Sequence, residues 1–277
     1  MPNFGRYCLI SLGLLGLAAP ASAADAFSSD WANGLKSAAR LISAGASDGV
    51  IHAGVEIKLA PGAITYWRNP GDAGLPPTLS FEGSTNLAQI RTYFPAPRRL
   101  AEKDGGEAFG YDGTVILPIE INARDAKKPV EVALKINYAV CEAICVPAEA
   151  SLRLTLQAGA AGPSPFADPI AKATTLVPRP VEWAGLSADL TSTSDKAWRL
   201  CLAPQAGPKR DVFIEAPESW WFDVRRDSAS ASGGDCFSLS LAQQPQDGKL
   251  PVSLRLTIAG GGGPVETTIA LAPRAKL

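Results

Sequence analysis

Apolar and polar or small residues alternate strictly in one segment near the middle of the chain. The apolar positions are Val130, Val132, Leu134, Ile136 and Tyr138, and the positions between them are Glu131, Ala133, Lys135 and Asn137. A period of two residues is typical of a β-strand with one buried and one solvated face. The pattern therefore predicts a half-buried strand over residues 130–138, just before Cys141.

Similar short alternating segments lie on both sides of this strand. They cover residues 55–59, 64–68, 114–121 and 152–156, and then 198–202, 212–214, 237–241, 252–258 and 265–271. Turn residues separate them and no long helical pattern occurs, which is typical of all-β sandwiches. Residues 25–47 look like a lead-in, in which Asp30 caps a turn or a short helix.

A stretch of small residues and prolines separates the strands into two groups. Residues 158–165 read Ala-Gly-Ala-Ala-Gly-Pro-Ser-Pro, a sequence that cannot pack and is typical of a linker. We therefore expect two β-sandwich domains in tandem, over residues 24–157 and 181–277, joined by a linker over residues 158–180.

The N-terminus has the pattern of a secretory signal peptide. Arg6 precedes a short apolar run over residues 8–19, Pro20 breaks the run, and Ala21-Ser22-Ala23 has the small-x-small form of a cleavage site. We expect cleavage after Ala23 and export of the mature chain. The alternative is an uncleaved membrane anchor, and the shortness of the apolar run argues against it.

Composition places the chain among ordinary globular proteins. The sequence is 46% hydrophobic and 19% charged, with a net charge of −1, which excludes disordered and fibrous classes. The near-neutral charge gives no reason to expect a nucleic acid as partner.

The exported chain would retain four cysteines, which allow three pairings. Proximity in the sequence favours Cys141 with Cys145 and Cys201 with Cys236. We expect Cys201–Cys236 to be a structural disulfide, because exported domains commonly use such bonds and the closed loop is long. A second redox pair is the alternative.

Cys141 and Cys145 allow three interpretations: a redox dithiol, a structural disulfide or part of a metal site. A loop this small removes little entropy from the unfolded chain, so the bond would stabilise the fold poorly. On a straight strand, residues i and i+4 lie roughly 13 Å apart, too far for a disulfide. A bonded pair therefore requires a bend between the cysteines.

The residues around the pair resemble a known family. The matching motifs are Tyr138-x-x-Cys141-x-x-x-Cys145-Val146-Pro147 and the run Tyr-Trp-Arg-Asn-Pro-Gly-Asp-Ala-Gly-Leu-Pro-Pro over residues 66–77. They are similar to the N-terminal periplasmic domain of the DsbD family of thiol:disulfide interchange proteins, and closest to its ScsB branch. The resemblance covers residues 48–157.

This resemblance implies an immunoglobulin-like fold, so we expect two tandem immunoglobulin-like β-sandwich domains after the signal peptide. It implies a thiol:disulfide exchange relay, and possible protein-disulfide reductase activity, without a cofactor. The partners would be a membrane carrier of the DsbD type and periplasmic thioredoxin-like or disulfide-bearing proteins. Cys145 would exchange with the partner and Cys141 would resolve the mixed disulfide. The family's membrane section and thioredoxin-like domain have no counterpart in this sequence.

Five further residues are candidate neighbours of the pair. In the family an aromatic loop caps the cysteines, which makes Phe109 and Tyr111 candidates for the cap; the alternative is that they are core aromatics beside a turn. The other candidates, Tyr138, Glu142 and Pro147, lie next to the pair in sequence. A negative charge on Glu142 would disfavour a thiolate, although a solvated surface role is the alternative.

A Cu(I) carrier is the competing function, because soft thiolates suit Cu(I). A protein-docking module with a purely structural disulfide is another alternative. The single histidine, His52, is typical of a surface or satisfied strand residue. We therefore expect no metal site.

Overall fold

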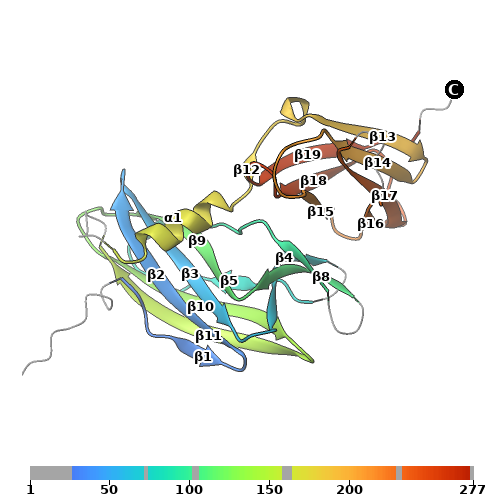
Figure 1. The fold of residues 1–277 in the computed structure, drawn as a ribbon. Helices are drawn as coiled ribbons and strands as arrows, with labels where there is room; N and C mark the ends of the chain where they lie inside the picture. Colours follow the sequence, from blue (N-terminus) through green and yellow to red (C-terminus); the bar gives the residue numbers. More distant parts are fainter. Residues whose placement is uncertain (1–26, 72–73, 102–105, 158–163, 229–232, 275–277) are drawn as a thin grey trace, which may run out of the picture.

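The computed structural model describes residues 27–71, 74–101, 106–157, 164–228 and 233–274. The described chain is nearly all β, as the sequence predicts, and its strands form two separate groups (Figure 1). No helix within these ranges is long and apolar enough to cross a membrane. The predicted signal peptide lies outside the described residues.

The first group forms two sheets that pack face to face. One sheet has the order β1-β2-β3-β9-β6, with bounds Ala32–Gly34, Ser37–Ser47, Val50–Leu59, Thr114–Ala123 and Leu87–Thr92. The other has the order β11-β10-β4-β8-β7, with bounds Cys145–Leu156, Val130–Cys141, Ile64–Gly71, Glu107–Asp112 and Arg98–Ala101, and β5 (Thr78–Ser80) also pairs with β10. Val55 and Leu117 of the first sheet and Leu134 and Leu152 of the second belong to one buried cluster. The predicted strand 130–138 is confirmed as part of β10.

The expectation of a lead-in over residues 25–47 is wrong. Residues Ser37–Ser47 form the long strand β2, which pairs with β3, and Ala32–Gly34 form β1. Among described residues 30–36 there is no helix after Asp30, and the turn there is at Leu35 and Lys36, between β1 and β2. Strand β2 is rich in Ala, Ser and Gly, and these small residues give a weak hydrophobic alternation even though alternate positions are buried.

A short helix lies inside the segment expected as a linker. Helix α1 (Ala167–Thr175) packs against β9, β2 and β3 of the first sandwich, as Figure 1 shows. Only Ile170 and Ala173 of this helix are buried. Two buried positions between proline-rich flanks give too little periodicity to predict a helix from the sequence.

The second group also forms two packed sheets. One has the order β12-β19-β18-β15, with bounds Arg179–Pro180, Val265–Leu271, Val252–Ala259 and Asp211–Glu215. The other has the order β13-β14-β17-β16, with bounds Ala188–Ser194, Ala197–Leu202, Asp235–Gln243 and Trp221–Arg226. A 3-10 turn, η1 (Trp183–Gly185), precedes β13. Leu200 and Phe237 of one sheet pack with Leu254 and Leu256 of the other.

The end of β4 joins the two sandwiches. The Arg68 guanidinium donates to both carboxylate oxygens of Glu215, with Nη2 2.7 Å from Oε1, and it also pairs with Glu266. The Asn69 side chain donates to the Ile214 carbonyl at 2.8 Å. Phe213 packs edge-on against Trp67, with ring centroids 6.0 Å apart. The strand that begins near the cysteines therefore ends in the contact between the sandwiches.

Replacing Arg68 with alanine tests this contact. We expect Arg68→Ala to lower the free energy of unfolding by about 1–3 kcal/mol, because charge-assisted hydrogen bonds are lost and two carboxylates remain without their main partner. Urea unfolding measures the loss. Arg98→Ala is the control, since the Arg98–Asp112 pair is exposed and should contribute at most about 0.5 kcal/mol. Equal losses in the two variants would contradict the interpretation.

Candidate functional site

The two cysteines lie at the tip of a β-hairpin. Strand β10 ends at Cys141, β11 begins at Cys145, and the two residues are directly opposite each other in the register. They form a disulfide with a Cα–Cα distance of 4.0 Å. Residues 142–144 make the bend that the pairing requires. The pairing expected from the sequence is confirmed.

The two sulfurs differ in exposure. Along β10, Val140 points into the sandwich core and Cys141 points to the opposite face of the sheet, where it packs with Ala139. Cys141 is only 5% exposed, whereas Cys145 is exposed and follows Ile144, which is 74% exposed. A partner can therefore approach Cys145 and not Cys141.

A buried tyrosine contacts both sulfurs. Tyr66 lies on β4, which pairs with the end of β10 and places Ile64 opposite Cys141. The Tyr66 hydroxyl oxygen lies 2.7 Å from Sγ of Cys141 and 3.4 Å from Sγ of Cys145. Its side chain is 1% exposed. Sequence reasoning did not select Tyr66, although it begins the run over residues 66–77 that carries part of the family resemblance.

Gly74 lies directly against the Tyr66 ring. A Cβ atom at Gly74 would be 2.2 Å from Cε1 of Tyr66, and the backbone there has a φ of +99°. Only glycine adopts this conformation without strain and leaves space for the ring. Gly74 therefore packs on the tyrosine that contacts the disulfide.

Replacing Gly74 with alanine should loosen this packing. We expect Gly74→Ala to lower the free energy of unfolding by about 1 kcal/mol or more and to speed reduction of Cys141–Cys145 by dithiothreitol. Gly113→Ala is the matched control, because Gly113 also has a positive φ, +73°, but nothing lies within 4 Å of its added Cβ. It should share the strain and leave the reduction rate unchanged. Equal reduction rates in the two variants would contradict the assigned packing.

The predicted neighbours from the hairpin lie in different environments. Glu142 is in the bend and forms an ion pair with Lys36, so a cation offsets the negative charge expected to oppose a thiolate. Pro147 is exposed and opposite Ala139 in the register. Tyr138 points into the core, where its hydroxyl lies 2.9 Å from Oγ of Ser37 and burial raises its pKa.

Phe109 and Tyr111 are core and interface residues in this structure. Phe109 packs edge-on against Phe213 of the second sandwich, with ring centroids 5.0 Å apart. The Tyr111 hydroxyl donates to the Pro95 carbonyl at 2.8 Å, and burial raises its pKa well above the ordinary value. Both side chains therefore make packing contacts, and the tyrosine that contacts the disulfide is Tyr66.

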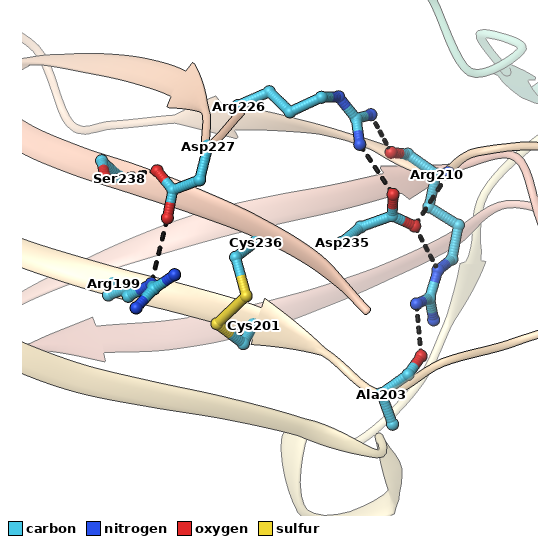
Figure 2. Close-up of a disulfide and its surroundings, with 9 residues drawn as sticks. All are labelled: Arg199, Cys201, Ala203, Arg210, Arg226, Asp227, Asp235, Cys236 and Ser238. Atoms are coloured by element: carbon cyan, nitrogen blue, oxygen red, sulfur yellow. Dashed lines mark hydrogen bonds and ion pairs between the residues drawn. A yellow bond between two sulfur atoms is a disulfide. The ribbon is translucent and has the colours of Figure 1, made fainter. Parts of the chain in front are cut away.

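The second disulfide joins neighbouring strands of the second sandwich. Cys201 of β14 and Cys236 of β17 are opposite each other in the register and are bonded, as the sequence predicts. Figure 2 shows the surrounding charged residues on the same sheet and nearby turns. Asp235 accepts from Arg210 at 3.3 Å and from Arg226 at 2.7 Å.

These arginines make the second sandwich sensitive to acid through Asp235. Burial acts to raise the pKa of Asp235, but hydrogen bonds from Arg210 and Arg226 outweigh it and hold the pKa below the ordinary value. A lowered pKa stabilises the fold at neutral pH, and this contribution is lost as the pH falls through the lowered pKa. We expect the stability difference between wild type and Asp235→Asn to shrink from pH 5 to pH 3, as urea unfolding at each pH would show. A constant difference would contradict the assignment.

The described residues include no group of three or more His, Cys, Asp or Glu side chains that could hold a metal ion. His52 is on β3, in the sheet that does not contain the cysteines.

The segment that contains this hairpin is similar to a known protein family. Residues 35–157 match the family model of the N-terminal domain of the thiol:disulfide interchange protein DsbD. This segment belongs to the DsbD N-terminal domain family. We call residues 35–157 the DsbD-type domain. The match includes both cysteines of the hairpin, Tyr66 and Gly74, and it ends before the second sandwich.

A solved structure extends the likeness to the second sandwich. The N-terminal periplasmic domain of ScsB from Proteus mirabilis is similar with a TM-score of 0.68 and 20% sequence identity, over 89% of this chain and 99% of that chain. At this identity the likeness concerns the fold alone. The C-terminal domain of the AgI/II polypeptide BspA from Streptococcus agalactiae aligns over 83% of this chain and 93% of that chain, but its TM-score of 0.20 and 8% identity support no argument. No curated protein matches the sequence.

Proposed function

We propose that this protein is a thiol:disulfide exchange relay that acts through Cys141 and Cys145. The observation that carries the proposal is the difference in exposure within one disulfide: Cys145 is exposed and Cys141 is 5% exposed. Exchange needs one accessible sulfur for the partner and a second sulfur close enough to release it. The match to the DsbD N-terminal domain family supports the same function.

The exchange proceeds in two steps, attack by Cys145 on the partner and release of the partner by Cys141. In the reduced protein, the Cys145 thiolate attacks one sulfur of a partner disulfide, which forms a mixed disulfide and releases the other partner sulfur as a thiolate. The Cys141 thiolate then attacks Sγ of Cys145, which forms Cys141–Cys145 and releases the second partner thiolate. Two electrons pass to the partner, and its two sulfurs take protons from water.

The cellular setting is part of the proposal. We place the protein in the periplasm, after removal of residues 1–23, where a membrane carrier of the DsbD type would exchange electrons with it. Its other partners would be thioredoxin-like or disulfide-bearing proteins. The predicted signal peptide supports this location, and the structurally similar ScsB domain is itself periplasmic.

The finer architecture is also proposed. We infer that both sandwiches are immunoglobulin-like and that the domains cover residues 24–157 and 181–277. Helix α1 lies in the intervening segment 158–180 and packs against β9, so this linker is anchored on the first sandwich. The second sandwich would then keep a fixed position beside β4 through Arg68.

Trapping in the periplasm tests the proposed function. In Cys141→Ala, Cys145 can still attack a partner but nothing releases the product, so mixed disulfides with the protein should accumulate after acid quenching and non-reducing electrophoresis. Cys145→Ala is the control and should trap nothing through Cys141, because Cys141 is buried. If Cys141→Ala accumulates no reducible adduct, or if Cys145→Ala traps equally, the proposed division of roles fails.

A further inference from the structure

We propose that Tyr66 is a catalytic residue of this exchange, whose hydroxyl donates a hydrogen bond to Cys141 and stabilises its thiolate. This inference rests on the proposed function and deepens it, because it assigns how the buried sulfur reacts. The Tyr66 hydroxyl lies 2.7 Å from Sγ of Cys141.

The direction of this hydrogen bond follows from chemistry. A sulfur in a disulfide carries no hydrogen, so the Tyr66 hydroxyl must be the donor while Cys141–Cys145 is bonded. The contact favours one sulfur, since the hydroxyl is 2.7 Å from Cys141 and 3.4 Å from Cys145. Hydrogen bonds to charged groups are stronger than hydrogen bonds to neutral groups. The hydrogen bond from Tyr66 therefore becomes stronger when Sγ of Cys141 becomes a thiolate.

Cys141 needs such a donor because it is buried. Removing a thiolate from water raises the thiol pKa, and Cys141 is 5% exposed among Tyr66, Ala108 and Ala139. Ala108 and Ala139 contribute no side-chain donor. The Tyr66 hydroxyl therefore offsets the desolvation of the thiolate that must form there.

The same hydrogen bond serves both directions of exchange. When the reduced pair acts on a partner, the Cys141 thiolate attacks Sγ of Cys145, forms the intramolecular disulfide and expels the partner thiolate. When a partner thiolate attacks Cys145, the Cys141–Cys145 bond breaks and Cys141 leaves as a thiolate. In both cases the negative sulfur adjoins Tyr66, which donates a hydrogen bond and keeps its proton.

Strand register and packing hold the hydroxyl in place. Ile64 is opposite Cys141 across β4 and β10, and Tyr66 is two residues further along the same face. Gly110 is opposite Tyr66 on the other side of β4, and Gly74 leaves room for the ring. The Tyr66 hydroxyl is therefore held beside Sγ of Cys141 with little freedom to move. A donor fixed in this way stabilises developing negative charge effectively.

The reaction of the reduced protein with Ellman's reagent tests this role. Cys145 attacks the reagent and releases one thionitrobenzoate, and Cys141 then displaces the second, so the two phases report the two sulfurs separately. In Tyr66→Phe we expect the second phase to slow by about tenfold or more at neutral pH, and its pH midpoint to rise by about one unit or more. The first phase should keep its wild-type rate and provide an internal check that the variant is folded.

Two other buried tyrosines provide matched controls. Tyr138→Phe and Tyr111→Phe each remove a buried hydroxyl, but these hydroxyls bond to Ser37 and Pro95, so both phases and the pH midpoint should match the wild type. If Tyr66→Phe shows the wild-type second phase, or slows it without moving its pH midpoint, the role of Tyr66 is overturned. If the wild-type protein releases no second equivalent, the proposed function and the role of Tyr66 are both overturned.

Discussion

We expect Cys145→Ala to abolish the proposed thiol:disulfide exchange, whereas Cys141→Ala should leave one half of the reaction intact. We expect this asymmetry because Cys145 is exposed and Cys141 is 5% exposed at the same hairpin tip. Turnover with a disulfide-bearing peptide should fall in Cys145→Ala to the background rate of a variant that lacks both cysteines. Cys141→Ala should form one mixed disulfide per chain and then stop.

Mass spectrometry of the quenched reaction separates the two variants. The Cys141→Ala product should carry one peptide on Cys145, removable by a reductant, and the Cys145→Ala product should carry none. Cys201–Cys236 should stay bonded in both variants. Equal labelling of the two variants would show that exposure does not decide which sulfur meets the partner.

Removal of the second disulfide should have the largest effect on stability. In the chain-entropy model, a bond that closes a loop of this length contributes about 3–4 kcal/mol, and Cys201 and Cys236 are 35 residues apart. We therefore expect Cys201→Ala/Cys236→Ala to lower the free energy of unfolding by about that amount. Urea unfolding followed by tryptophan fluorescence measures it.

The first disulfide supplies the matched comparison. Cys141 and Cys145 are four residues apart, so Cys141→Ala/Cys145→Ala should cost about 2 kcal/mol in the same model and should abolish exchange. The Cys201→Ala/Cys236→Ala variant should retain exchange at temperatures where it is folded. Loss of exchange in that folded variant would instead make Cys201–Cys236 a second redox pair.

Features that depend on strong local patterns were predictable from the sequence. The alternation of residues 130–138 predicts β10 because large apolar residues occupy every second position. The pairing of Cys141 with Cys145, and the bend between them, follow from separation along the chain and from disulfide geometry. Strand β2 was missed because Ala39 and Ser43 are buried without giving a strong hydrophobic signal.

The environment of the disulfide depends on contacts between distant segments. Tyr66 and Cys141 are 75 residues apart in the sequence, and they are in contact because β4 pairs with the end of β10. No local sequence pattern specifies the register of that pairing. Phe109 was a candidate cap because an aromatic residue beside a turn fits either a cap or a core. In the structure it packs against Phe213 of the second sandwich, and a single sequence does not reveal that contact.

The reduction potential of Cys141–Cys145 tests the central claim most directly. Equilibration of the protein with glutathione or dithiothreitol buffers, with the two states resolved by alkylation and mass spectrometry, gives a value for each disulfide. A relay requires Cys141–Cys145 to lie above about −300 mV, within the range of exchanging proteins, and a structural Cys201–Cys236 should lie below it. A value for Cys141–Cys145 well below about −300 mV would mark a structural bond and contradict the proposed relay.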